Sequence, residues 1–157
     1  MSRFTDLSES ERAPYVQETA ARLDVAPQIV EKDFWVCWTL RLLFSRPEFA
    51  QDLVFKGGTS LSKVFKVIGR FSEDIDLSIG LPLLGHEESF LTDRISGNQM
   101  RKRQAEVVQK CAAYVQNEFR QSLEDDIKAI LGTRPGGSDW LDYEYESATE
   151  SPVLGPT

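Results

Sequence analysis

Hydrophobic and polar residues follow helical spacing over the first part of the chain. Ser8 to Glu11 match the S-x-x-E capping box, which predicts a helix that runs to about Leu23. Pro27 suits the first position of a second helix, which continues through IVEKDFWVCWTLRLLF and stops before Pro47. Because apolar residues cover most of its circumference, we expect this second helix to be largely buried against a sheet.

A short strand and a short helix are predicted next. Residues 52–56 form a strand that ends at Gly57-Gly58, where the chain is expected to turn. Thr59 or Ser60 can cap the helix that follows, and Gly69 would end it.

The next strand carries two aspartates one residue apart. Residues 74–79 alternate between polar and apolar side chains, so a period of two places Asp74, Asp76 and Ser78 on one face. The apolar face is expected to join the core. The other face would then present two neighbouring carboxylates.

One long helix dominates the C-terminal half of the sequence. A loop over residues 80–97, with a helical turn near residues 88–93, precedes a helix over residues 98–131 that Gly132 ends. Residues 140–147 alternate as a further strand. The apolar stripe of the long helix consists of Val107, Cys111, Tyr114, Val115, Phe119, Leu123, Ile127 and Ile130.

This order of elements predicts an α/β (α+β) fold, in which a small mixed sheet has helices packed against it. A chain of 157 residues, 41% of them hydrophobic, suits a single domain with one core. We expect that domain to occupy residues 1–146, followed by a flexible tail over residues 147–157.

Charge and cysteine content narrow the classes of function. The net charge of −7 argues against a general nucleic-acid binder, so RNA would need a local basic patch. Cys37 and Cys111 are predicted to be buried free thiols. No signal peptide and no membrane-spanning run are evident, so we expect a cytoplasmic protein that does not enter a membrane. The candidate basic patch comprises Lys63, Lys66, Arg70, Arg101, Lys102 and Arg103.

His86 is the only histidine. Without clustered Cys and His ligands, a zinc site is not expected. A Ser-His-Asp arrangement would depend entirely on this one residue.

The glycine-rich turn has the features of a phosphate cradle. Gly57 and Gly58 would let the backbone approach a ligand closely, and the helix start favours negative charge. The hydroxyls of Thr59 and Ser60 could donate to phosphate oxygens, with Lys63 one turn further along. The spacing of a Walker P-loop is absent, and an ordinary strand-to-helix turn is the alternative interpretation.

The Asp74-x-Asp76 pair has the features of a magnesium site. Two carboxylates on one face of a strand repel each other unless a cation lies between them, and Mg²⁺ prefers oxygen ligands. The alternative is a pair of solvated acids on an exposed sheet face. Phosphoryl and nucleotidyl transfer need phosphates and metal in one cleft, and a short helix between the two motifs would bring them together.

The segments GGTSLSK and RFSEDIDLSI resemble the AbiEii/AbiGii family of bacterial toxin-type nucleotidyltransferases, within the DNA polymerase β-like superfamily. EKDFWVCWTLRLLF and LVFKGG are similar to the lead-in helix and first strand of that family. The resemblance covers about residues 30–80 and, less specifically, residues 100–120. Lys32 and Asp33 match a charged pair of the lead-in helix that has no assigned role.

The resemblance implies a nucleotide-binding set and a metal-binding set. Asp74 and Asp76 would ligate Mg²⁺ as catalytic residues of a magnesium-dependent transfer. The acceptor would be a molecule such as tRNA, and the enzyme would act as the toxin of a toxin–antitoxin or phage-defence module. The nucleoside triphosphate would be held by Gly57, Gly58, Thr59 and Ser60, with Lys63 as a further contact.

The sequence departs from the family towards its C-terminus. Family members carry a third carboxylate on a later strand, then a lysine and an acid, and only Glu144 and Glu146 offer substitutes here. We therefore expect the N-terminal portion of such an enzyme, with an open sheet edge that favours self-association or an antitoxin partner. A non-catalytic remnant that binds nucleotide or a protein partner, and a purely structural domain, are the alternatives.

Overall fold

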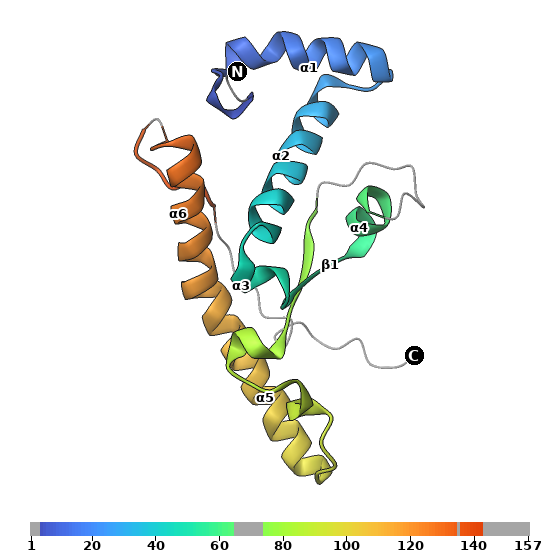
Figure 1. Cartoon of the computed structure of the whole chain (residues 1–157), viewed down its shortest axis with the longest axis vertical. Coiled ribbons are helices and arrows are strands. Elements are labelled where there is room, and N and C mark those ends of the chain that lie inside the picture. Colours follow the sequence, from blue (N-terminus) through green and yellow to red (C-terminus); the bar gives the residue numbers. More distant parts are fainter. Residues whose placement is uncertain (1–3, 65–73, 135, 143–157) are drawn as a thin grey trace, which may run out of the picture. The chain divides into compact units, whose positions relative to one another are not determined.

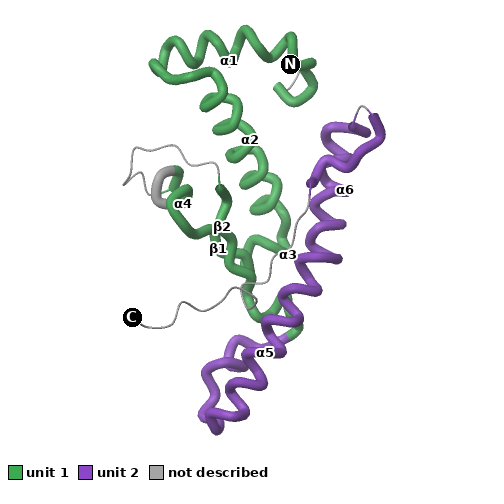
Figure 2. Tube along the Cα trace, turned by 180° about the vertical axis from the view of Figure 1, so that it is seen from behind, with its two compact units in different colours: residues 1–85 green, residues 86–157 purple. Residues whose placement is uncertain are grey.

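The computed structural model describes residues 4–64, 74–134 and 136–142 of the 157-residue chain. These fall into two compact units, residues 1–85 and 86–157, which Figure 2 distinguishes by colour. The predicted domain boundary at residue 146 lies outside the described residues, so it stays a prediction.

Two helices open the first unit, as predicted. After a 3₁₀ turn, η1 (Phe4–Asp6), helix α1 (Glu9–Leu23) starts at a capping box: the Ser8 N–H donates to the Glu11 carboxylate at 2.8 Å. Helix α2 (Pro27–Phe44) begins at the proline and leads into the short α3 (Pro47–Ala50). Both predicted helices are confirmed.

The expected burial of α2 against a sheet is wrong. Only Val36 and Leu43 of this helix are buried, and it packs mainly on α1 and α3 (Figure 1). The physical reason is the small size of the sheet in the described part of the chain, two strands of four residues each. The aromatic residues of α2 instead pack edge to face, with Trp35 and Trp38 ring centroids 5.7 Å apart at an interplanar angle of 81°.

Strands β1 (Leu53–Lys56) and β2 (Asp76–Ile79) form an antiparallel pair. Leu53 lies opposite Ile79, and Lys56 lies opposite Asp76. Helix α4 (Gly57–Lys63) follows β1 directly and packs on both strands. The predicted α/β class with a small sheet is confirmed, although the two strands described are antiparallel and not mixed.

The start of α4 differs from the prediction. The helix begins at Gly57 and its N-cap is Lys56, which makes no side-chain cap hydrogen bond. Thr59 and Ser60 therefore lie inside the first turn and are not caps. Gly57 has a φ of +73°, which glycine adopts without steric cost, and this conformation turns the chain from β1 into α4. The predicted helix end at Gly69 lies outside the described residues.

The first unit ends with a 3₁₀ turn, η2 (Leu81–Leu84), in a segment for which the sequence predicts a loop. Gly80 before it lies against residue 52: a Cβ there would be 2.9 Å from the Asp52 carbonyl oxygen. The buried side chains described in this unit come from α1, α2, α3, β1, α4 and η2: Val16, Ala20, Val36, Leu43, Phe49, Leu53, Thr59, Ser60 and Leu84.

The second unit contains the predicted long helix in three parts. After η3 (Glu88–Leu91), helix α5 (Gly97–Tyr114) runs into a π-helical turn, η4 (Val115–Phe119), and on into α6 (Arg120–Leu131). Gly132 ends it with a φ of +76°, as predicted. The apolar stripe is mostly half-buried: Ile127 is buried, whereas Ile130 is 39% exposed.

Three predictions remain: the strand over residues 140–147, the burial of the two thiols and the absence of a membrane-spanning helix. Residues 140–142 are not a strand, and the rest of the strand expected over residues 140–147 lies outside the described part. Both cysteines are free, but Cys37 is exposed and Cys111 is half-buried, so the predicted burial of both thiols is wrong. Among the helices described, none combines the length and the apolar content needed to cross a bilayer.

Candidate active site

The glycine turn and the acidic strand meet in the first unit. A Cβ placed on Gly57 would lie 1.7 Å from Asp76 Oδ2 and 2.6 Å from Asp76 Cγ, so the Asp76 carboxylate is in direct contact with the Gly57 Cα. Gly57 and Asp76 are both exposed. The β1–β2 register explains this contact, because residue 56 lies opposite residue 76 and the chain turns into α4 immediately afterwards.

Hydrogen bonds from two buried hydroxyls fix this arrangement. The Thr59 side chain, which is fully buried, donates to the backbone carbonyl of Asp74. Ser60 is also buried, and its hydroxyl donates to the Gly57 carbonyl at 2.9 Å. Thr59 therefore connects α4 to the residue that carries the first aspartate, and Ser60 braces the glycine turn.

Asp74 and Asp76 both have exposed side chains. Neither forms an ion pair with another residue of the described ranges. Both carboxylates are therefore exposed and close to the glycine turn, which makes the pair a candidate cation site.

Lys63 lies at the end of α4 and forms an ion pair with Asp33 of α2. The family resemblance predicts Lys63 as a nucleotide contact and assigns no role to Asp33. No local pattern could have paired them, because they are 30 residues apart.

A family model described as "Nucleotidyl transferase AbiEii toxin, Type IV TA system" matches residues 39–154. The chain belongs to the AbiEii family. The match covers β1, the glycine turn, both aspartates and the long helix, which confirms the family resemblance of the sequence. No curated protein and no solved structure matches the chain. A nucleotidyl transferase toxin role follows at the level of the family.

The AbiEii match begins inside α2, at residue 39. Asp33 lies before that point, although its partner Lys63 lies within the match. The predicted substitutes Glu144 and Glu146 are within the match and outside the described residues.

The donor set of the AbiEii aspartate pair decides which kind of metal site it can form. Within the residues described, no three His, Cys, Asp or Glu side chains cluster closely enough to hold an ion. Mg²⁺ commonly takes only one or two protein carboxylates and completes its octahedron with phosphate and water. The two exposed aspartates therefore fit Mg²⁺ bound together with a nucleotide, and they do not fit a closed metal site made of protein ligands alone.

Two other candidate residues of this AbiEii chain, His86 and Arg103, have structural partners. His86 is stacked on Phe90, with ring centroids 3.9 Å apart, and its Nε2 is 3.7 Å from a Glu106 oxygen. Arg103 donates to the Phe90 carbonyl and to Asp93, each at 2.7 Å. Of the predicted basic patch, Arg101 and Lys102 are exposed, and Lys66 and Arg70 lie outside the described residues.

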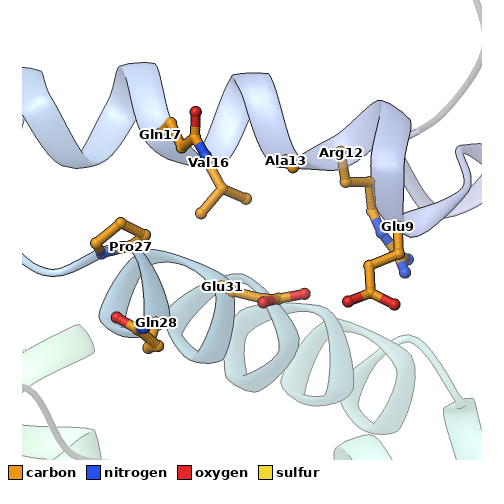
Figure 3. A pocket seen from close by; sticks show the side chains of 8 residues that line it. All are labelled: Glu9, Arg12, Ala13, Val16, Gln17, Pro27, Gln28 and Glu31. Carbon is orange, nitrogen blue, oxygen red and sulfur yellow. The ribbon is translucent and has the colours of Figure 1, made fainter.

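A small cavity lies between α1 and α2 (Figure 3). It has a volume of about 160 Å³, and the side chains of Glu9, Arg12 and Glu31 border it. The Arg12 guanidinium lies over the Trp35 ring, 5.3 Å from the centroid, and its Nε is buried without a hydrogen-bond partner among the residues that the structure describes. None of the predicted nucleotide or metal ligands borders this cavity.

A buried glutamate in the second unit was missed by the sequence analysis. Glu124 accepts hydrogen bonds from the backbone N–H groups of Trp140 at 2.8 Å and Leu141 at 2.9 Å. Burial alone would raise the pKa of Glu124, but these two donors and the Lys128 ammonium together hold it below the ordinary value. An acid beside the apolar stripe, between Leu123 and Ile127, was the available signal.

A larger, polar cavity of about 540 Å³ follows η4 and α6 in this unit. Glu124, Lys128 and Asp139 border it, and Lys128 Nζ is 3.0 Å from Asp139 Oδ1. Lys128 forms ion pairs with both Glu124 and Asp139, so these charges are paired within the protein. We therefore attribute the cavity to the contacts that attach residues 139–141 to α6.

Proposed function

We propose that this protein transfers a nucleotide from a nucleoside triphosphate to an acceptor, in a Mg²⁺-dependent reaction at the Gly57–Asp76 contact. The acceptor we favour is RNA, with tRNA as the first candidate. The observation that carries this proposal is the direct contact between the Asp76 carboxylate and Gly57, the first glycine of the turn. Phosphates held by the turn would therefore lie beside the carboxylates.

The side chains and the backbone of the turn would have different roles in binding the triphosphate. The hydroxyls of Thr59 and Ser60 donate to backbone carbonyls, so their side chains would position the turn. The first N–H groups of a helix lack intrahelical partners, so those of Gly57 and Gly58 would be available to phosphate oxygens, whereas Thr59 is fully buried. Lys63 would add the one positive charge of the set.

Asp74 and Asp76 would hold the metal ion. Bound there, Mg²⁺ would neutralise charge that develops on the phosphates during transfer. The carboxylates themselves would orient the ion, and the Thr59 hydrogen bond to Asp74 would keep the first of them in place. Their exposure leaves the face open to an acceptor hydroxyl.

The family description assigns such toxins to type IV toxin–antitoxin systems, so an antitoxin is the expected functional partner. We place the reaction in the cytoplasm, where nucleoside triphosphates and tRNA are found together. Self-association through an open sheet edge is a further expectation.

The first test is binding of ATP, GTP, CTP and UTP by calorimetry, with and without Mg²⁺. We expect Mg²⁺-dependent binding of at least one of them, and its loss in Asp74→Asn and in Asp76→Asn. Asp24→Asn is the matched control, because Asp24 is an exposed aspartate of the same unit in a left-handed conformation that asparagine also accepts. Mg²⁺-dependent binding that survives in both site variants would contradict the proposal.

Transfer is tested separately, with a labelled triphosphate and total tRNA. Label that moves to RNA with the unaltered protein and not with Asp76→Asn supports the enzyme. The alternative is a protein that binds nucleotide without transfer, and it is favoured by the absence of a third clustered carboxylate among the described residues. Binding without any transfer would favour that alternative.

A further inference from the structure

Asp33 and Lys63 connect two helices of the first unit. Asp33 lies in α2, Lys63 lies in the last turn of α4, and the Lys63 ammonium donates to Asp33 Oδ1. The side chains are 40% and 22% exposed, so solvent and salt screen this pair less than a fully exposed one. The contact is tertiary, since 30 residues separate the partners.

Asp33 has a second neighbour that limits its orientation. Its other oxygen, Oδ2, is 3.9 Å from Cys37 Sγ, one turn further along α2. Asp33 Oδ2 therefore faces Cys37 of its own helix, and Asp33 Oδ1 faces Lys63 of α4. This arrangement holds the lysine in one direction.

Lys63 has donors left for a ligand. An ammonium group has three N–H donors, and Asp33 uses one of them. Among the predicted nucleotide contacts, the two hydroxyls already donate to backbone carbonyls. Lys63 is thus the only side chain of that set which offers both charge and unused donors.

We propose that Asp33 is a positioning residue, which holds the Lys63 ammonium in place to receive the phosphates of the nucleotide. This inference rests on the proposed function. A free lysine side chain would lose its rotamer freedom when it binds a phosphate, and the ion pair with Asp33 removes that freedom beforehand. Repulsion between Asp33 and the phosphates acts in the opposite direction, but it is weakened because the ammonium lies against the carboxylate.

The test is a double-mutant cycle on nucleotide affinity. The dissociation constant of the tightest-binding of ATP, GTP, CTP and UTP is measured by calorimetry with Mg²⁺ for the unaltered protein, Asp33→Asn, Lys63→Met and the double variant. We expect Asp33→Asn to raise the dissociation constant roughly two- to tenfold, the cost of ordering one rotamer-rich side chain. In the Lys63→Met background the same change should have no further effect.

Two further variants separate positioning from general effects. Asp33→Glu keeps the carboxylate and should restore most of the affinity, which a purely steric role of Asp33 would not predict. Glu31→Gln removes a negative charge from the same helix, two residues away, and should leave affinity unchanged. Thermal unfolding of every variant checks that each is folded.

The outcomes distinguish this inference from the proposed function. If the unaltered protein binds and Asp33→Asn binds equally well or more tightly, or weakens binding equally in both backgrounds, the inference is overturned and the proposed function stands. If the folded, unaltered protein binds no triphosphate, the proposed function fails and this inference fails with it.

Discussion

The Asp76 carboxylate is in direct contact with the Cα of Gly57, which leaves no room for a side chain on residue 57. A Cβ on residue 57 would be 1.7 Å from one carboxylate oxygen and 3.0 Å from the Asp76 Cβ, which the strand holds in place. The glycine also has a φ of +73°, a conformation that side chains rarely adopt. One residue thus permits both the turn into α4 and the approach of the acid.

Gly57→Ala should therefore disturb the candidate site and the fold together. The left-handed backbone costs about 1–2 kcal/mol for a residue with a Cβ, and the clash must also rotate the Asp76 side chain away. We expect a lower free energy of unfolding in denaturant titrations and loss of Mg²⁺-dependent nucleotide binding.

Gly97→Ala is the control for this substitution. Gly97 is the first residue of α5, and an added Cβ there meets nothing within 4 Å. Alanine at that position should leave stability unchanged or raise it by up to about 1 kcal/mol. Equal stability of the two alanine variants would show that the contact between Gly57 and Asp76 is not formed.

Thr59→Val tests the hydrogen bond that connects α4 to the acidic segment. The substitution keeps the shape of the side chain and removes the donor to the Asp74 carbonyl. Because Thr59 is fully buried, we expect a loss of about 1–3 kcal/mol in the free energy of unfolding. The Thr19 hydroxyl donates to the Tyr15 carbonyl on the exposed side of α1, so Thr19→Val should cost much less.

Glu124→Gln should change how stability depends on pH. The folded-state pKa of Glu124 lies below the ordinary carboxyl value of 4.5. Its contribution is therefore fully present above that value and is lost as the pH falls through the lower folded-state pKa. At pH 7 we expect the variant to lose about 1–3 kcal/mol, because a neutral amide replaces the charged acceptor of two backbone N–H groups.

Thermal unfolding at a series of pH values measures this difference. The gap between the unaltered protein and Glu124→Gln should narrow as the pH drops below the ordinary carboxyl range. Glu118→Gln, an exposed glutamate of the neighbouring π-helical turn, should show no such gap. A gap that stays constant down to strongly acidic pH would argue against the carboxylate as its cause.

The two thiols should react at different rates. Cys37 is exposed, whereas Cys111 is half-buried and burial raises its pKa. At mildly alkaline pH, a thiol-specific alkylating reagent should label Cys37 several-fold faster, as followed by peptide mass spectrometry. Cys37→Ser should remove the fast phase. Faster labelling of Cys111 would contradict the described environment of α2.

Local sequence was enough to predict the ends of the long helices and the family of the chain, although not α3 or the start of α4. The capping box at Ser8, the proline at residue 27 and the glycine at residue 132 act within one or two turns, so each helix boundary follows from neighbouring residues. The spacing of GGTS and DID identified the family before any contact was known.

Only the tertiary structure decided which residues meet. That Asp76 rests on Gly57, that Asp33 holds Lys63 and that Glu124 anchors residues 140 and 141 all depend on chain segments separated by more than a dozen positions. The burial expected for α2 was wrong for the same reason: an apolar surface predicts that something covers it, whereas packing partners elsewhere in the chain determine how much of it is covered.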